Sequence, residues 1–304
     1  MSIVANNNRA LIDELKRTIA KIVDDSSLRA TIGDAWRTNF DLLCQKVLTC
    51  DPNDFLNWNV ILRTMVVGNA DFVRDELDFL KDLPDWKRRW EMALEESPVG
   101  NPTLYNDFPS SSGNLIHQAY HLAQFENKTG MDISNASFVL EFGGGYGCMC
   151  RLVHSLNFKG RYVIFDLPPF SALQRFFLNM NGISSITSNA FFEKNSNGVI
   201  CVSELEQLES ILSCHAYIGN AVFITNWSLS ESPINLRHSI LPLVKSFKAF
   251  LVAYQGRFGD IDNVGFFEEE WINTMKDIKW HHWKIKHLPN QLYRDNYYLM
   301  GKKR

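Results

Sequence analysis

The sequence of 304 residues has few cysteines, no basic excess and no long apolar run. The six cysteines form no spaced loop framework, and Cys148 and Cys150 lack the two-residue spacer of common zinc and redox pairs, so we expect free thiols in a reducing compartment. The 31 Lys and Arg against 34 Asp and Glu give a net charge of −3. Since phosphate contacts need a basic excess, this balance argues against nucleic acid as a partner.

No uncharged apolar run approaches the ~20 residues that span a bilayer. Residues 1–8 are polar and lack the apolar core of a secretory signal. The sequence therefore predicts a cytoplasmic protein without a membrane partner.

The first hundred residues show apolar side chains at helical spacing and no strand-like alternation. We expect helices at about 11–23, 36–48, 52–65, 71–80 and 85–96, with Asn69 as the cap of the fourth. Residues 97–113 are rich in Pro, Gly and Ser, which is loop composition. The sequence thus predicts an N-terminal helical domain at 1–112 and a second domain at 113–304.

Beyond a predicted helix at 114–128, apolar runs of strand length alternate with helices. The runs are 138–142, 162–165, 183–187, 199–202, 221–225, 250–253, 280–286 and 297–302. Such alternation predicts a mainly parallel sheet with helices on both faces. The last two runs, joined by a Pro-Asn loop, predict a terminal hairpin with the last strand antiparallel, an ending that methyltransferase sheets have and dehydrogenases lack.

A glycine-rich turn follows the first of these runs, in the segment Glu141-Phe-Gly-Gly-Gly-Tyr-Gly147. Glycines let the chain bend sharply and let a ligand lie against bare main chain. The helix predicted from Cys148 adds free amide donors. The dinucleotide fingerprint G-x-G-x-x-G/A fails, because its last position is Cys148. The pattern here is E-x-G-x-G-x-G, and Glu141 can accept hydrogen bonds from the ammonium group of S-adenosylmethionine.

Asp166 ends the next predicted strand, about 20 residues beyond the turn, the spacing at which a carboxylate meets an adenosine ribose. It can also cap the helix that Pro168 and Pro169 begin, and the two roles are compatible.

These motifs resemble a bacterial family of sugar O-methyltransferases in the S-adenosylmethionine-dependent, Rossmann-like class. The resemblance covers roughly residues 97–302 and depends on four segments, 112–121, 140–147, 165–168 and 226–231. It implies a Rossmann-like methyltransferase fold with S-adenosyl-L-methionine as cofactor. The cofactor-binding residues we predict are Glu141, Gly143, Gly144, Gly145, Tyr146, Gly147, Asp166, Leu167, Ser203 and Asn226. For the adenine base two turns stay open, Thr187–Phe191 and Val202–Glu204.

Removing the proton of an acceptor hydroxyl requires a general base. His117 and His121 are four residues apart on one face of a predicted helix and are the leading candidates, although packing or a metal pair would also explain them. Glu231 is a third candidate for the general base. Alternatively, it is present because a carboxylate is favoured near the start of a helix. The predicted substrate-binding residues are Tyr120, Ser228 and Arg257. Arg257 also fits a plain surface loop.

The sequence therefore predicts methyl transfer to a hydroxyl of a sugar-type small molecule. The alternatives are an O- or N-methyltransferase for aromatic or amine acceptors and a non-catalytic scaffold. No metal site is predicted, although a divalent metal and a homodimer stay open.

Overall fold

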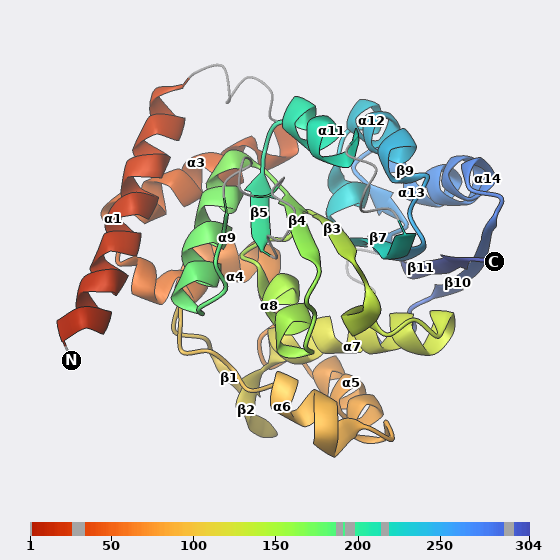
Figure 1. Cartoon of the computed structure of the whole chain (residues 1–304), viewed down its shortest axis with the longest axis horizontal. Coiled ribbons are helices and arrows are strands. Elements are labelled where there is room, and N and C mark those ends of the chain that lie inside the picture. Colours follow the sequence, from red (N-terminus) through yellow and green to blue (C-terminus); the bar gives the residue numbers. More distant parts are fainter. Residues whose placement is uncertain (1, 26–33, 187–190, 192–197, 214–218, 289–294) are drawn as a thin grey trace.

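The computed structural model describes residues 2–25, 34–186, 191, 198–213, 219–288 and 295–304 (Figure 1). Seven strands form the main sheet in the order β10-β11-β7-β6-β3-β4-β5. The strands are β3 Phe138–Phe142, β4 Arg161–Phe165, β5 Val199–Val202, β6 Ala221–Asn226, β7 Ala249–Gln255, β10 Ile278–Lys284 and β11 Asn296–Lys303. Neighbours from β5 to β7 pair in parallel, whereas β11 runs antiparallel to both β7 and β10.

The parallel strands are apolar on both sides because helices cover both faces of the sheet. Every residue of β3, β4 and β5 is buried. One face carries α7 (Gly113–Thr129), α8 (Cys148–Ser155) and α9 (Pro168–Met180), and their apolar side chains form one cluster with Val139 and Ile164. The other face carries α11 (Leu205–Ser213) and α12 (Ile234–Val244), which cluster with Leu140 and Val163.

The N-terminal helices extend the first of these clusters. They are α1 Ser2–Asp24, α3 Asp34–Thr49, α4 Asn59–Met65, α5 Phe72–Lys81 and α6 Glu91–Ala93. Figure 1 shows α1 and α3 beside α9, where the ring of Trp36 meets Phe170 edge-on at 5.9 Å between centroids. The predicted domain boundary at 112/113 stays a prediction.

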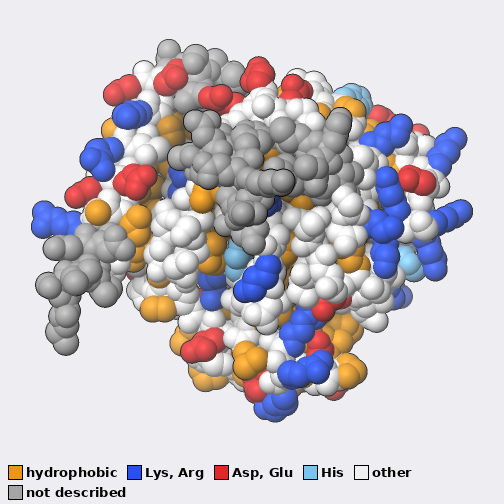
Figure 2. Space-filling model, viewed as in Figure 1, with side chains coloured by type: hydrophobic (Ala, Val, Ile, Leu, Met, Phe, Trp, Pro, Cys, Tyr) orange, Lys and Arg blue, Asp and Glu red, His pale blue; other side chains and the backbone are white. Residues whose placement is uncertain are grey.

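Shorter elements complete the chain. They are the 3-10 helices Pro52–Asn57, Ile133–Asn135 and Ser228–Glu231, the π-helices Trp86–Trp90 and Phe266–Trp271, α13 Asn263–Gly265, α14 Ile272–Thr274, and the two-stranded pairs β1 Leu104–Tyr105 with β2 Phe108–Ser112 and β8 Arg257–Phe258 with β9 Ile261–Asp262. In the described residues, no helix is long and apolar enough to cross a membrane. On the surface in Figure 2, basic side chains gather at the end where β10 and β11 lie.

Three local expectations differ from the structure. The pair β1–β2 lies inside the expected loop and gives the N-terminal region two short strands, because a tight turn at Asn106 lets Tyr105 pair with Phe108. Asn69 does not cap α5; its side chain accepts from the backbone N of Asn106 at 2.7 Å and so holds this hairpin.

The expected strand at 183–187 is reduced, in its described part, to a single parallel bridge between Ser185 and Val199; residue 187 lies outside the described residues. The side chain of Asn179 binds both the backbone and the hydroxyl of Ser185, which takes up hydrogen bonds that a strand would use. The predicted fold class is confirmed, with its antiparallel last strand between β7 and β10.

Candidate functional site

The glycine turn after β3 and the segment after β6 meet at the point where the strand order reverses. From β3 the sheet continues to β4 and β5 on one side and to β6 and β7 on the other. Ligands of open α/β sheets bind outside the carboxyl ends of the strands at such a point. Here the hydroxyl of Ser228 donates to the carbonyl of Gly143 at 3.0 Å. The structure thus brings a predicted substrate residue against the predicted cofactor turn.

The turn is held in shape by the carboxylate of Asp166. Gly143, Gly145 and Gly147 have φ of 74°, 58° and 100°, a region that favours glycine. The amide of Gly145 donates to Oδ2 of Asp166 at 3.0 Å, and the amide of Gln174 donates to the same oxygen and to the carbonyl of Gly145, each at 2.8 Å. The backbone N of Leu167, the N-cap residue of α9, donates to Oδ1 of Asp166 at 2.8 Å. Asp166 therefore binds the turn and the start of α9 together.

Side chains of the protein pack directly on this turn. A Cβ added to Gly143 would lie 2.1 Å from the Ser228 side chain, and one added to Gly145 would lie 3.1 Å from Sδ of Met65. The packing of the protein therefore requires glycine at 143 even without a ligand. The glycine pattern alone is not proof of a cofactor site.

Two buried acceptors at this edge lack a partner. In the described part of the chain, Oε1 of Gln174 and Oδ1 of Asn226 make no hydrogen bond. A buried acceptor left unpaired costs free energy, so a ligand that brings donors would be favoured here. Gly143, Gly144, Gly145, Asp166, Leu167, Ser203, Asn226 and Ser228 are half-exposed along the same edge. This edge fits a cofactor that carries hydroxyls and an ammonium group.

Glu141 lies beneath the turn, where it is 5% exposed and accepts from the hydroxyl of Tyr162 at 2.8 Å. Burial raises the pKa of Glu141 to about 8, and the nearby charge of Asp166 adds to the rise, although the Tyr162 bond opposes it. Burial likewise raises the pKa of Asp166 to about 7, against the hydrogen bonds it receives. Glu141 is therefore mostly protonated at neutral pH without a ligand, and its contact with an ammonium group stays a prediction.

Other predicted cofactor residues have structural partners. The hydroxyl of Tyr146 accepts from Asn114 at 2.7 Å, and its ring is buried against Phe177, 5.1 Å between centroids. Ser203, after β5, donates to Ser171 at 2.8 Å. Of the alternative adenine turn, residues 187–190 lie outside the described residues.

The two predicted base histidines lie together on α7. His117 and His121 are buried, and their Nε2 atoms are 3.0 Å apart. Nδ1 of His117 lies 2.8 and 2.9 Å from the carboxylate oxygens of Glu76 on α5, and Nδ1 of His121 bonds the hydroxyl of Tyr298 on β11. All four ring nitrogens therefore have a partner within the protein.

His287 adds a fifth member to this network, which we call the histidine network (Glu76, His117, His121, His287, Tyr298). Its Nε2 lies 2.8 Å from Oε1 of Glu76. Burial is the largest single effect on the pKa of Glu76 and raises it. The neighbouring His117 and His287 together outweigh burial, so this pKa lies below its ordinary value. Burial, then the charges of His117 and His287, hold the pKa of His121 well below its ordinary value. Glu76 is thus charged and His121 neutral.

The segment after β6 connects the network to the switch point. Nδ2 of Asn226 donates to Gln118 on α7 at 3.0 Å. Trp227 has a φ of 72°, unusual for a bulky residue, and its ring lies 5.9 Å from that of His121. Backbone strain of this kind persists where surrounding contacts hold it and is frequent at functional sites.

The remaining predicted residues lie elsewhere on this side of the sheet. Glu231 accepts from Nε2 of Gln255 at 3.0 Å, and Arg257 is exposed on β8, where Asp262 pairs with it in register. Tyr120 is half-buried, with its ring 5.0 Å from that of His287. Tyr120 is thus the predicted substrate residue that lies beside the network.

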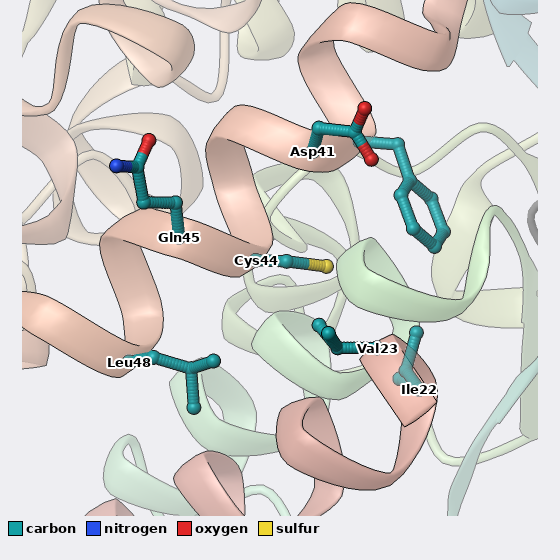
Figure 3. A pocket seen from close by; sticks show the side chains of 7 residues that line it. Ile22, Val23, Asp41, Cys44, Gln45 and Leu48 are labelled. Atoms are coloured by element: carbon teal, nitrogen blue, oxygen red, sulfur yellow. The ribbon is translucent and has the colours of Figure 1, made fainter. Parts of the chain in front are cut away.

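Two other features carry no comparable chemistry. In the described ranges, no group of three or more His, Cys, Asp or Glu side chains could hold a metal ion. A pocket of about 210 Å³ lies between α1 and α3, with Cys44, Asp41 and Gln45 on its wall (Figure 3). Burial raises the pKa of the Cys44 thiol to about 12, so it is not a nucleophile at neutral pH.

No protein-family model matches the chain, and no curated protein matches its sequence. Solved structures with a similar fold include a candidate sarcosine dimethylglycine methyltransferase from Galdieria sulphuraria, with a TM-score of 0.42, 10% identity and coverage of 63% of this chain and 86% of that one. The METTL16 methyltransferase domain aligns with a TM-score of 0.41 and 12% identity over 66% of this chain and 72% of its own. Because these scores lie below 0.5, the fold assignment depends on the strand order of this chain itself.

Proposed function

We propose that this protein is an S-adenosylmethionine-dependent methyltransferase that methylates a hydroxyl of a sugar or glycosylated metabolite. The observation that carries the proposal is the contact between the glycine turn after β3 and Ser228, just after β6, at the switch point of the sheet. The resemblance of residues 97–302 to sugar O-methyltransferases supports the sugar acceptor.

The cofactor would lie along the half-exposed edge formed by Gly143–Gly145, Asp166 and Ser203, with Asn226 at its reactive end. When bound, it supplies an electrophilic methyl group, which forms a bond to the acceptor oxygen as the carbon–sulfur bond breaks and its electron pair stays on sulfur. The protein supplies alignment and a place for the acceptor proton.

The acceptor side carries polar groups that suit a hydroxylated molecule. Gln118 and Asn226 are half-exposed and bonded to each other, and Oδ1 of Asn226 still has no donor among the described residues. A site with such groups rejects molecules that leave them unpaired. The histidine network lies directly behind, so a proton acceptor is close to this surface.

Calorimetry with S-adenosylmethionine and with its demethylated product tests the cofactor assignment. We expect both to bind the wild-type protein, and Asp166→Asn to weaken both at least about tenfold, since it removes the charge that shapes the turn. Asp260→Asn, an exposed site on the β8–β9 pair, is the matched control and should bind normally. Absence of binding to the wild-type protein would refute the proposal.

An aromatic acceptor is the second candidate, favoured by the half-exposed rings of Tyr120 and Trp227 near the network. Transfer of labelled methyl to panels of methyl hexosides, phenols and amines separates the two. Turnover with phenols or amines and none with hexosides would replace the sugar assignment.

A further inference from the structure

We infer that His287 is the group that accepts the proton of the acceptor hydroxyl, and that Glu76 positions it. This inference rests on the proposed methyl transfer. It replaces the direct role expected of His117 and His121, because the structure leaves neither of them a ring nitrogen for a substrate.

Exposure separates His287 from the rest of the histidine network. Its side chain is 18% exposed, against 6% for His117 and 0% for Glu76. His121 is 0% and Tyr298 1% exposed. A small molecule can therefore reach the network at His287, while the other members lie behind it.

The charge of Glu76 determines which histidine nitrogens donate to it. A charged carboxylate only accepts, so His117 must donate to Glu76 from Nδ1 and His287 from Nε2. Nε2 of His117 shares a hydrogen bond with Nε2 of His121, and Nδ1 of His121 shares one with the hydroxyl of Tyr298, so these two rings have no nitrogen left for a substrate. Nδ1 of His287 is the one remaining ring nitrogen of these three histidines, and no hydrogen bond to it is found within the described residues, so it is open to an acceptor hydroxyl.

The topology places His287 just beyond the carboxyl ends of the parallel strands, where the acceptor would bind. β10 ends at Lys284, which pairs with Tyr297 near the start of β11. β11 begins at Asn296, opposite Gln255 at the carboxyl end of β7. Residue 287 thus follows the carboxyl end of β10, at the same end of the sheet as Asn226, the last residue of β6.

The surroundings of His287 suit a general base. Glu76 of α5 bonds its Nε2, the ring of Tyr120 on α7 lies 5.0 Å away and that of Phe72 lies 6.3 Å away. Other titratable rings near this carboxylate are His117, Tyr120 and Tyr298, and the charge of Glu76 adds to the raised pKa of both tyrosines, which burial causes first. The fixed carboxylate sets the tautomer of His287 and stabilises the imidazolium that proton uptake creates.

The proton step balances within these groups. The O–H bond of the acceptor breaks as its oxygen attacks the methyl carbon, and the proton forms a bond to Nδ1 of His287. The positive charge on the ring is then next to the negative charge of Glu76. Exchange with water at the exposed ring returns the proton to solvent.

Nitrogen-15 NMR of labelled histidine tests the hydrogen-bond pattern without any acceptor. We expect a proton on Nε2 of His287 and on Nδ1 of His117, both in a hydrogen bond to Glu76, no hydrogen bond at Nδ1 of His287, and a neutral His121. His287→Gln and His281→Gln variants assign the signals. An unprotonated Nε2 on His287, or a ring nitrogen of His117 or His121 without a hydrogen bond, would overturn the inference.

Turnover provides the second test, with the methyl hexoside that the wild-type protein methylates fastest. We expect His287→Ala to lower kcat by about 10²- to 10⁴-fold, to remove the acidic limb of its pH profile and to regain activity with added imidazole. Glu76→Gln should lower kcat more than it changes KM. His281→Ala, on β10 and outside the network, is the matched control.

These outcomes separate the inference from the proposed function. A His287→Ala protein that binds S-adenosylmethionine and keeps full turnover would refute the role of His287 alone. A wild-type protein that does not bind S-adenosylmethionine would refute the methyltransferase assignment, while the NMR pattern still decides the state of the network.

Discussion

Two buried glutamates, one in each half of the site, have opposite electrostatic states. Glu141 lies in the half with β3, β4 and β5, where its pKa is raised to about 8 by burial. Glu76 lies on α5 in the histidine network and is fully buried, yet its pKa is lowered because His117 and His287 outweigh burial. Similar burial therefore gives a mostly neutral acid in one place and an anion in the other, and the partners decide which.

The two acids make stability depend on pH with opposite signs, Glu141 above the ordinary glutamate pKa and Glu76 below it. Between its ordinary pKa of 4.5 and about 8, the folded protein holds a proton on Glu141 that the unfolded chain has lost, so stability falls as the pH rises through this window. Glu76 stabilises the folded protein above its ordinary pKa, and this contribution is lost as the pH falls through its lowered pKa.

The largest expected effect on stability comes from removing the charged acid, Glu76. Glu76→Gln leaves the buried His117 and the half-buried His287 without their anion and should lower the free energy of unfolding by about 3 kcal/mol at pH 7. Urea denaturation measures this, with Glu95→Gln at an exposed site as the control. An unchanged midpoint would show that the network does not depend on a charged Glu76.

The next change tests the half that contains Glu141, through the backbone of the glycine turn. Gly143→Ala meets Ser228 at 2.1 Å and has a φ of 74°, whereas Gly182→Ala has a φ of 73° with no atom within 4 Å. The difference between the two isolates the contact with Ser228. We expect Gly143→Ala to cost about 2 kcal/mol more in thermal unfolding and to weaken cofactor binding. Equal losses would mean that Ser228 moves aside freely.

Removing the other buried acid, Glu141, should raise the free energy of unfolding at high pH instead of lowering it. Glu141→Gln can still accept from Tyr162 but has no charge to bury, so at pH 8.5 it should stabilise the protein by about 1 kcal/mol and flatten the decline in stability between pH 6 and 8.5. Thermal unfolding across this range checks the prediction. A destabilised variant at pH 8.5 would show that the carboxylate has a partner that outweighs its burial.

The smallest expected effect comes from Met65, whose side chain packs on the glycine turn at Gly145. Met65→Ala removes the side chain whose Sδ lies 3.1 Å from where a Cβ of Gly145 would be. We expect a loss of less than about 1 kcal/mol in stability and an association rate of S-adenosylmethionine about threefold higher in stopped-flow measurements. A slower association would mean that Met65 helps to form the site.

Sequence reasoning was effective where the signal is local. The strand, glycine turn and helix from Phe138 to Ser155 follow one another along the chain, and so do β4 and Asp166. Local patterns of this kind set the fold class, which is confirmed. The hairpin β1–β2 was missed because its pairing depends on a side chain outside it, Asn69.

The histidine network could not be assembled in this way. Its five members come from α5, α7, β11 and the segment after β10, and the bonded pair Glu76 and His287 is separated by 211 residues. One local sign was present. Glu76 stands on the apolar face of α5 with Val73, Leu77 and Leu80, where a charge is unexpected unless it is paired.

The order of apolar runs and turns in this sequence determined a parallel sheet with an antiparallel last strand and a glycine turn at its centre, because periodicity and glycine freedom act over a few residues. Tertiary structure decided which acids are charged and which histidine is open. Those states depend on burial and on partners from distant segments, and neither is defined until the chain has folded.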